Sequence, residues 1–497
     1  MKKIKFIALA IVVIMLSSFI FSCYNDTTPQ NVPPADDTGG ETTPGAGEEN
    51  GGEAEPEVVG FQIPEADLEG YVMRILTISD EAWAIPELDV EELIGSPVND
   101  AIFNRNRQIE AALNVTIQEI RGGWTPHEML SRAVLAGSDE YDIMFAHASA
   151  GAPLASQGFY FNLHDISTLN LDQPYWDQGA IRSFELMNKL YFTTSDACLM
   201  TNDAIWVLYF NKVLAQDKGL DNPYQLVREG RWTVDAMYNM MRQAVTDVDG
   251  SGIPGPDDIW GMASHGLAFM MFTTSFGELL INQDADGIPY LIEPSDRFIT
   301  AYSRIRDLMN ASTGMYLGAG ALPGADFAHA TTPFMNNRTL FLAEVLGWAR
   351  TFREMTADFG ILPHPKLDEN QPTHFNATAN TVPIVAIPIT NPNPERTGLF
   401  LDVLTALSET TVIPAYYTIS LEGQFVRDED SIEMLDIIRS NRIYDLGVIY
   451  SWAGFWTSFI SHGMSPAGEN PLTIFDRFRR VVDTQIERTI DAFESVG

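Results

Sequence analysis

The sequence has little cysteine and few basic residues, and both shortages exclude classes of protein. Its 497 residues contain two cysteines, Cys23 and Cys198, so neither a disulfide scaffold nor a cysteine-based zinc site is expected. Lys and Arg number 30 against 67 Asp and Glu, which gives a net charge of −37. Nucleic-acid binding requires a basic face, so this balance argues against it. The length exceeds that of an ordinary single domain, roughly 100–200 residues.

The sequence also lacks the motifs of common enzyme classes. HExxH, GxSxG and the P-loop pattern are all missing, and each of these would carry a recognisable chemistry. The eight histidines are scattered without metal-ligand spacing. Among 67 acidic residues, pairs of carboxylates are expected by chance, and a glycosidase needs two at a defined separation. We therefore expect a protein that is not an enzyme, with a surface glycoside hydrolase or lyase as an open alternative.

The N-terminus has the pattern of an export signal. Three lysines within the first five residues precede an almost wholly apolar run that ends at Phe21, as in the basic and hydrophobic regions of a signal peptide. The tetrad Ile20-Phe21-Ser22-Cys23 resembles a bacterial lipobox. We predict a lipoprotein signal peptide at 1–22, lipidation of Cys23 and an extracytoplasmic location at the membrane. A plain membrane anchor with an idle cysteine is the alternative.

Residues 23–57 are predicted to form a disordered acidic tether. The segment is rich in Thr, Pro, Gly and Glu and contains nine acidic and no basic residues. It cannot bury enough apolar surface to offset the entropy of ordering the chain. We expect it to separate the folded part from the membrane.

The remaining chain alternates strand-like and helix-like segments. Strands are expected at Tyr71–Ile78, Asn114–Ile120 and Tyr141–Ala146, and helices at Val90–Leu113 and after Thr125. Later strands are expected at Leu190–Thr194, Ile205–Phe210, Leu340–Val345, Phe359–Leu362 and Ile384–Ile389, and later helices at Thr233–Ala244, Asp296–Met309, Pro394–Leu407, Ser431–Arg439 and Ile474–Glu494. Alternation of this kind favours parallel sheets covered by helices.

Several stretches, in a fixed order, resemble extracellular solute-binding proteins of bacterial ABC importers, of the carbohydrate type. The matching segments run from about Tyr71 to Tyr450 and include Asp142-Ile-Met-Phe, Leu154-Ala-Ser-Gln-Gly, Phe161-Asn-Leu-His-Asp, Leu208-Tyr-Phe-Asn-Lys-Val, Trp232-Thr-Val-Asp and Ile387-Pro-Ile-Thr-Asn-Pro. No single segment is diagnostic, but their order is.

The resemblance implies an α/β, two-lobed, periplasmic-binding-protein-like fold of type II, with a mainly parallel sheet in each lobe and a hinge between the lobes. The first lobe would take 58–195 plus 357–410, and the second 196–356 plus 411–497. It also implies that the lobes close on a sugar or oligosaccharide and deliver it to an ABC transporter permease. A peptide or other polar solute, and a surface adhesin or sensor without transport, remain alternatives.

A calcium loop is the most specific local signal. The segment Asp247–Asp258 fits the twelve-residue EF-hand loop, with Asp247, Asp249 and Ser251 at positions 1, 3 and 5 and Gly at 6. Ile253 would offer its carbonyl at position 7, and Asp258 replaces the usual Glu at position 12. We predict a structural Ca²⁺ site, with a solvated acidic turn as the alternative.

Ligand-binding residues are expected among aromatic and acidic side chains near strand ends. Sugar rings pack on aromatic rings, and their hydroxyls need polar partners; open sheets bind ligands at the carboxyl ends of their strands. The candidates are Trp124, His147, Asp196, Trp206, Tyr209, Glu344, Trp348, Trp452 and Trp456. For each tryptophan the competing interpretation is a place in the core.

Overall fold

Two mixed β-sheets organise the part of the chain that the computed structural model describes, residues 61–79, 84–85, 87–252, 255, 257–308, 315–316, 328–418, 429–463 and 468–495. These residues belong to the second of two units, Gly60–Gly497; the first is Met1–Val59. The predicted signal peptide, the tether and Cys23 lie outside the described residues.

The first sheet has the order β12-β3-β1-β2. Strand β1 (Tyr71–Thr77) pairs in parallel with β2 (Val115–Arg121) and with β3 (Ile143–His147), while β12 (Pro383–Ala386) pairs antiparallel with β3. Every residue of β3 and β12 is buried. This sheet is therefore mainly parallel, as predicted, and its last strand comes from far along the chain.

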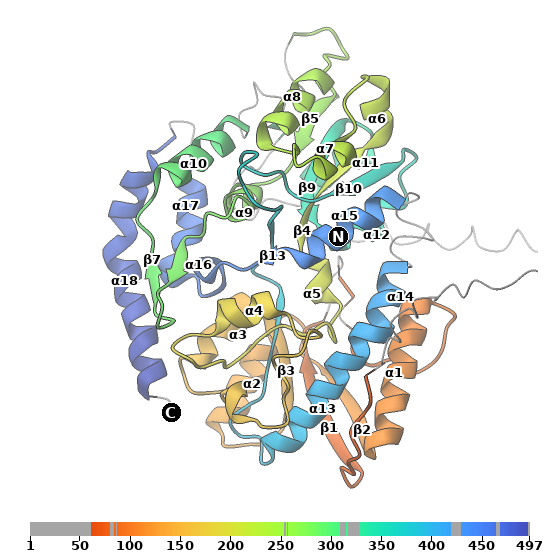
Figure 1. Cartoon of the computed structure of the whole chain (residues 1–497), viewed down its shortest axis with the longest axis vertical. Coiled ribbons are helices and arrows are strands. Elements are labelled where there is room, and N and C mark those ends of the chain that lie inside the picture. Colours follow the sequence, from red (N-terminus) through yellow and green to blue (C-terminus); the bar gives the residue numbers. More distant parts are fainter. Residues whose placement is uncertain are drawn as a thin grey trace, which may run out of the picture. The chain divides into compact units, whose positions relative to one another are not determined.

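The helices on this sheet begin and end where the local sequence directs. Helix α1 (Pro97–Leu113) starts with proline in its first turn and ends at Asn114, whose left-handed φ of 49° stops the helix. Helix α2 (Pro126–Leu135) begins after Thr125, as predicted. With α3 (Ala148–Ala155) and α13 (Pro394–Leu407) they make up what we call the first lobe, the lower half of Figure 1.

The second sheet has the order β10-β4-β9-β5-β8. The bounds are β4 Trp206–Asn211, β5 Trp260–Ala263, β8 Met315–Tyr316, β9 Thr339–Val345 and β10 Phe359–Leu362. β4 runs antiparallel to both its neighbours, whereas β5 runs parallel to β8 and β9. The other four strands therefore all run in the same direction and β4 alone is reversed, so this sheet too is mainly parallel, as predicted. β4 and β9 are buried along their whole length. Burial of both faces of the sheet produces a continuous apolar run in each strand, and such a run is typical of parallel sheets.

This second sheet and its helices form the second lobe, the upper half of Figure 1. Its helices include α6 (Lys212–Asp217), α7 (Pro223–Arg228), α8 (Val234–Ala244), α11 (Ala328–Met335), α12 (Ala349–Phe352) and α15 (Glu429–Ser440). Because β10 pairs with β4, the segment that follows 357 starts in the second sheet and reaches the first only at β12.

Three segments of the chain pass between the two sheets. The first passes through α5 (Met200–Asp203) to β4, the second through β11 (Asn376–Ala377) to β12, and the third through β13 (Arg442–Ile443), which pairs with β11.

The strand expected at Leu190–Thr194 is not formed; Thr193 makes an isolated bridge to Val385 instead. Its apolar side chains are buried without a ladder.

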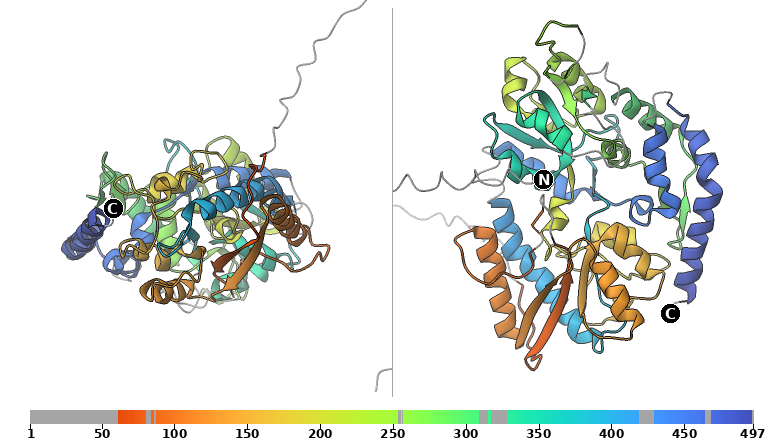
Figure 2. Two further views of the ribbon diagram at one scale, coloured as in Figure 1. Left: turned by 90° about the horizontal axis from the view of Figure 1, so that it is seen from below. Right: turned by 180° about the vertical axis from the view of Figure 1, so that it is seen from behind.

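A further group of elements lies along one flank. It comprises α9 (Leu267–Ser275), β6 (Ile281–Gln283), β7 (Pro289–Leu291), α10 (Asp296–Leu308), α16 (Leu446–Ile449), α17 (Phe455–Gly463) and α18 (Pro471–Ser495). Both face views place α17 beside the long α18, at the left in Figure 1 and at the right in Figure 2. Helix α4 (Gln178–Phe184) lies in the first lobe.

Helix α13 continues through a π-helical turn, Ser408–Val412, into α14 (Ile413–Thr418). The run Pro394–Tyr417 is long and apolar enough to cross a membrane by length and composition, but 67% of its most apolar window is buried. It packs on α1 as a core helix.

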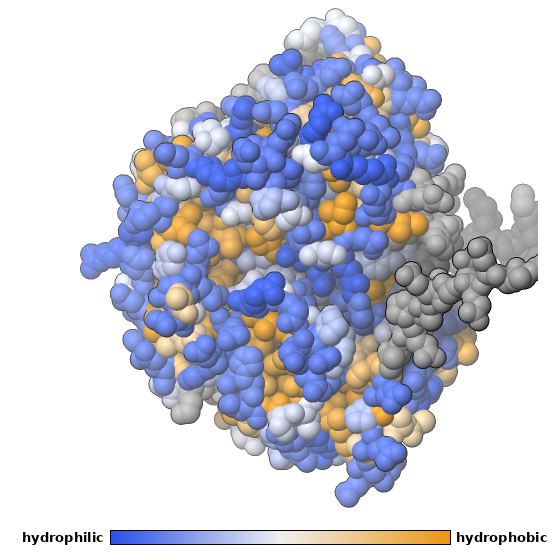
Figure 3. All heavy atoms as spheres, viewed as in Figure 1, coloured by the Kyte–Doolittle hydropathy of each residue, from blue (hydrophilic) through white to orange (hydrophobic). Residues whose placement is uncertain are grey.

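The face drawn in Figure 3 is mainly hydrophilic, with hydrophobic residues in separate patches.

Candidate functional site

A pocket of about 610 Å³, partly open to solvent, lies where both lobes and a crossing segment meet. Four of its residues are tryptophans, which come from different elements. The described residues that line it are Trp124, Trp206, Leu267, Met271, Glu344, Val345, Trp348, Ala379, Asn380, Thr381 and Trp456. Five of the nine residues predicted to contact ligand are therefore brought together here.

Strand pairing explains why residues far apart in sequence meet in this pocket. Antiparallel pairing of β4 and β9 sets Trp206 opposite Val345 and Val207 opposite Glu344. Trp348 ends the short 3₁₀ turn that follows β9. Trp124 follows β2 in the first lobe, and Trp456 lies in α17. The walls therefore come from both lobes, as an enclosed ligand requires.

Glu344 is held in place by two hydrogen bonds. One carboxylate oxygen lies 3.0 Å from Nε2 of His265, and the other accepts the backbone N–H of Val345 at 2.9 Å. Glu344 is 1% exposed. The His265 ring also lies 5.4 Å from the Trp206 ring. His265 was not among the predicted residues, although it follows β5, at the same sheet edge as Glu344.

Trp124 rests on His147. Their ring centroids are 5.0 Å apart, and Nδ1 of His147 is 2.9 Å from the carbonyl oxygen of Thr381. His147 is buried, whereas Trp124 is 53% exposed. An exposed indole with one supported face can offer its other face to a ligand. His147 itself does not line the pocket and acts as the support of Trp124.

The other three candidates, Tyr209, Asp196 and Trp452, make their contacts with protein groups outside the pocket. The Tyr209 hydroxyl donates to the carbonyl oxygens of Val345 and Leu346, at 3.0 and 2.7 Å. Its strand alternates, so Tyr209 faces the opposite side of the sheet from Trp206, in a separate hydrophobic cluster. Burial raises the pKa of Tyr209 well above its ordinary value.

Asp196 lies in an ionic cluster on the first crossing segment. Its carboxylate is 2.6 Å from a guanidinium nitrogen of Arg439 and 3.5 Å from one of Arg442. Burial opposes ionisation of this carboxyl, but Arg442 and Arg439 outweigh it, so the pKa of Asp196 is lowered. Trp452 stacks on Tyr450, with centroids 4.7 Å apart. Neither Asp196 nor Trp452 is among the described residues that line the pocket.

The acidic loop brings three carboxylates together and could hold a metal ion. Oxygen atoms of Asp247, Asp249 and Asp258 all lie within 4.8 Å of one another. Asp247 accepts the backbone N–H groups of Gly250 and Gly252, and Asp249 accepts that of Ser251. Hydrogen bonds from Ser251 lower the pKa of Asp249, which favours the carboxylate that a cation needs.

The backbone of this loop also matches the predicted turn. Gly252 has φ of 71°, at the sixth position of the loop, where a residue with a side chain would be strained. A bridge between Thr246 and Ile259 closes the loop, and Asp258 accepts N–H groups of Val248 and Gly255. Ile253 lies outside the described residues.

Comparison with known proteins identifies the fold. No protein-family model matches the sequence, and no curated protein matches it. Among solved structures, the chain is similar to an ABC substrate-binding protein of Listeria monocytogenes in complex with cycloalternan (TM-score 0.55, 12% identity, 84% of this chain and 100% of that one). It is also similar to the GacH receptor of Streptomyces glaucescens, solved with acarbose (0.55, 11%, 85% and 99%).

A third similar structure is the maltose/maltodextrin-binding domain of Bdellovibrio bacteriovorus bound to maltotriose, with a TM-score of 0.53, 14% identity and coverage of 84% of this chain and 100% of that one. The ligands described for these three proteins are cycloalternan, acarbose and maltotriose. The predicted two-lobed α/β fold of periplasmic binding proteins is confirmed.

Proposed function

We propose that this protein captures a sugar or oligosaccharide outside the cytoplasm and delivers it to an ABC transporter permease. One observation carries the proposal: four indoles and the carboxylate of Glu344 line a single pocket bordered by both lobes. Indoles offer flat apolar faces to the C–H faces of sugar rings, while Glu344 and Asn380 offer polar partners to hydroxyls. The saccharide complexes among similar structures point in the same direction.

Binding would work by closure of the lobes. Trp124 comes from the first lobe and Trp348 from the second, so a ligand that contacts both indoles favours the closed arrangement over the open one. The closed form would then dock on the permease. No step in this cycle breaks a bond of the ligand.

Isothermal titration with a panel of neutral oligosaccharides, followed by tryptophan fluorescence, tests the proposal. We expect micromolar binding of at least one saccharide, with a change in fluorescence. Trp348→Ala should weaken it at least tenfold, because an interface hot spot of this kind is worth about 2 kcal/mol. Trp232→Phe is the matched control, since Trp232 is fully buried and donates to the carbonyl of Pro363.

The same panel separates the alternatives. Binding of peptides but of no saccharide would contradict the sugar proposal. Appearance of shortened glycans would indicate a hydrolase or lyase. Saccharide binding by a protein that supports no uptake in cells would favour the adhesin or sensor.

We further propose that the acidic loop binds Ca²⁺ as a structural ion. Carboxylate, hydroxyl and carbonyl oxygens on a short loop suit a hard cation, and Asp258 would take the place of the usual glutamate. Millimolar Ca²⁺ should raise the melting temperature by several degrees, because the folded state alone binds the ion. Asp247→Ala combined with Asp249→Ala should abolish the rise, while Asp286→Ala, in another acidic turn, should retain it. Identical melting curves in Ca²⁺ and in chelator would count against this site.

We also propose that Cys23 is lipidated and holds the protein at the membrane. The basic start, the apolar run and the tetrad that ends in Cys23 support this. Cys23→Ala should stop the incorporation of labelled fatty acid, because the thiol that carries the lipid is removed. Unchanged labelling of the variant would contradict the assignment.

A further inference from the structure

Among the described residues that line the pocket, the only charge is negative and no Lys or Arg opposes it. Glu344 is the one charged side chain among the described residues that line the pocket, and it is 1% exposed. His265 holds its carboxylate through a hydrogen bond at 3.0 Å. A neutral imidazole can donate this bond, which orients the carboxylate and leaves its negative charge in place.

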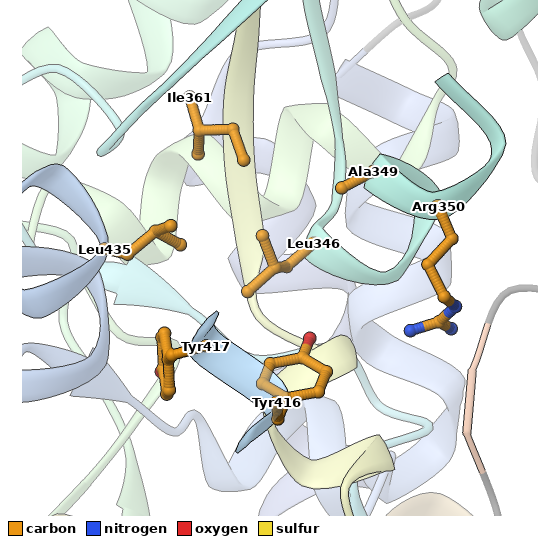
Figure 4. A pocket seen from close by; sticks show the side chains of 7 residues that line it. All are labelled: Leu346, Ala349, Arg350, Ile361, Tyr416, Tyr417 and Leu435. Atoms are coloured by element: carbon orange, nitrogen blue, oxygen red, sulfur yellow. The ribbon is translucent and has the colours of Figure 1, made fainter. Parts of the chain in front are cut away.

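The arginine nearest in sequence to this wall is engaged elsewhere. Arg350 comes two residues after Trp348, but its guanidinium binds the buried Asp203 carboxylate at 2.8 Å. Figure 4 shows Arg350 at a different, smaller cavity, together with Tyr416, Tyr417 and Leu435. Arg350 therefore pairs with Asp203, and it is not among the described residues that line the pocket of Glu344.

The four indoles add to the same preference. The face of an aromatic ring carries a partial negative charge, so it attracts a cation above it and disfavours an anion. Tryptophan is the strongest of the three aromatic residues in this respect. An amine on a sugar ring would gain from the indole faces and from Glu344, whereas a carboxylate would be desolvated without a partner.

We propose that this pocket selects saccharides by charge: it accepts neutral rings, prefers rings that carry an amine and rejects rings that carry a carboxylate. This inference rests on the proposed saccharide binding and specifies the class of saccharide. The whole-chain charge of −37 acts in the same sense over longer distances. That long-range effect is screened by salt, whereas the effect of a buried carboxylate is screened much less.

Sugars that share a ring and differ in charge test the inference. Binding of D-glucose, D-glucosamine and D-glucuronate, and of the galactose series, is measured by titration calorimetry at pH 7 in 0.05 M and 0.5 M NaCl. We expect glucuronate or galacturonate to bind at least tenfold more weakly than the neutral sugar, and the amino sugar at least threefold more tightly. A substantial part of the difference in affinity between the amino sugar and the acidic sugar should persist in 0.5 M NaCl.

Glu344→Gln identifies the source of the discrimination. Glutamine keeps an oxygen that can accept a hydrogen bond from His265 but loses the charge. The ratio of the affinity for the amino sugar to that for the acidic sugar should therefore fall at least tenfold. Glu293→Gln is the control, because Glu293 has an 83% exposed side chain and does not line the pocket. Circular dichroism verifies that both variants fold.

The outcomes distinguish the inference from the function on which it rests. The charge selection is overturned, while saccharide binding stands, if the acidic sugar binds as tightly as the neutral sugar or more tightly. It is also overturned if the ratio of the affinities for the amino and the acidic sugar is unchanged in Glu344→Gln. A difference in affinity that vanishes in 0.5 M NaCl also overturns it, since the net charge alone would then explain the preference. Failure of both series and of the neutral oligosaccharide panel to bind overturns the saccharide function itself.

Discussion

At the scale of single residues, the tryptophans differ in whether their rings already pack against other side chains of the protein. Trp452 is 5% exposed, stacks on Tyr450 with an interplanar angle of 5°, and donates to Thr489. Trp348 is half-buried and lines the pocket. The sequence favoured both equally, because an indole that serves the core and one that serves a ligand look alike without their neighbours. Their assignment as ligand contacts stays a prediction.

Trp452→Phe should lower stability without changing sugar affinity. The variant keeps most of the stack on Tyr450 but loses the hydrogen bond from Nε1 to Thr489 Oγ1, which is 2.9 Å long. We expect a loss of about 1–2 kcal/mol in the free energy of unfolding, measured by urea denaturation. A tenfold loss of saccharide affinity with unchanged stability would instead place Trp452 in the binding site.

At the scale of elements, the sequence predicted most strands and helices and mainly parallel sheets, but not that β4 runs opposite to the other four strands of the second sheet. Strand β4 was recognised from its apolar residues, yet hydrophobicity does not report whether a neighbour runs parallel or antiparallel. Its alternation did contain usable information. Trp206 and Tyr209 are an odd number of residues apart, so they face opposite sides of a strand, and one of the two had to point away from any ligand near the other.

The crossing segment between β10 and β12 should make the protein sensitive to acid. His364 is buried against Phe272, with ring centroids 4.8 Å apart, and its Nδ1 is 2.8 Å from Ser275 Oγ. His374 Nδ1 is 2.9 Å from the His364 carbonyl oxygen. Burial lowers the pKa of His364 to about 3 and that of His374 to about 4. Both therefore remain neutral in the folded state at mildly acidic pH.

The unfolded state binds more protons than the folded state between these values and the ordinary histidine pKa of about 6.5, so stability falls as the pH falls through this range. The two histidines together should remove roughly 3 kcal/mol of unfolding free energy between pH 6.5 and pH 5. Urea denaturation across this range measures the slope. His374→Gln should reduce this slope by about half, because one of the two buried histidines is then gone.

At the scale of the whole molecule, ion pairs on the crossing segments connect the lobes. Asp203, at the end of α5, is fully buried and accepts from Arg350 of the second lobe. It also accepts from Tyr416 of α14 at 2.7 Å and from the Ile85 N–H at 2.8 Å. These partners are dispersed over the chain, and no spacing rule relates them. This is why the sequence indicated two lobes through resemblance but not the contacts that join them.

Arg350→Met should therefore destabilise the protein far more than removal of a surface arginine. The variant leaves the Asp203 carboxylate buried with two hydrogen bonds and no cation, which typically costs about 3–5 kcal/mol. Arg231→Met is the matched control: Arg231 pairs with Glu229 at 2.7 Å, but their side chains are 59% and 39% exposed, so its loss should cost less than about 1 kcal/mol. Urea denaturation at pH 7 measures both. Equal losses in the two variants would show that the Asp203 contact does not hold the lobes together.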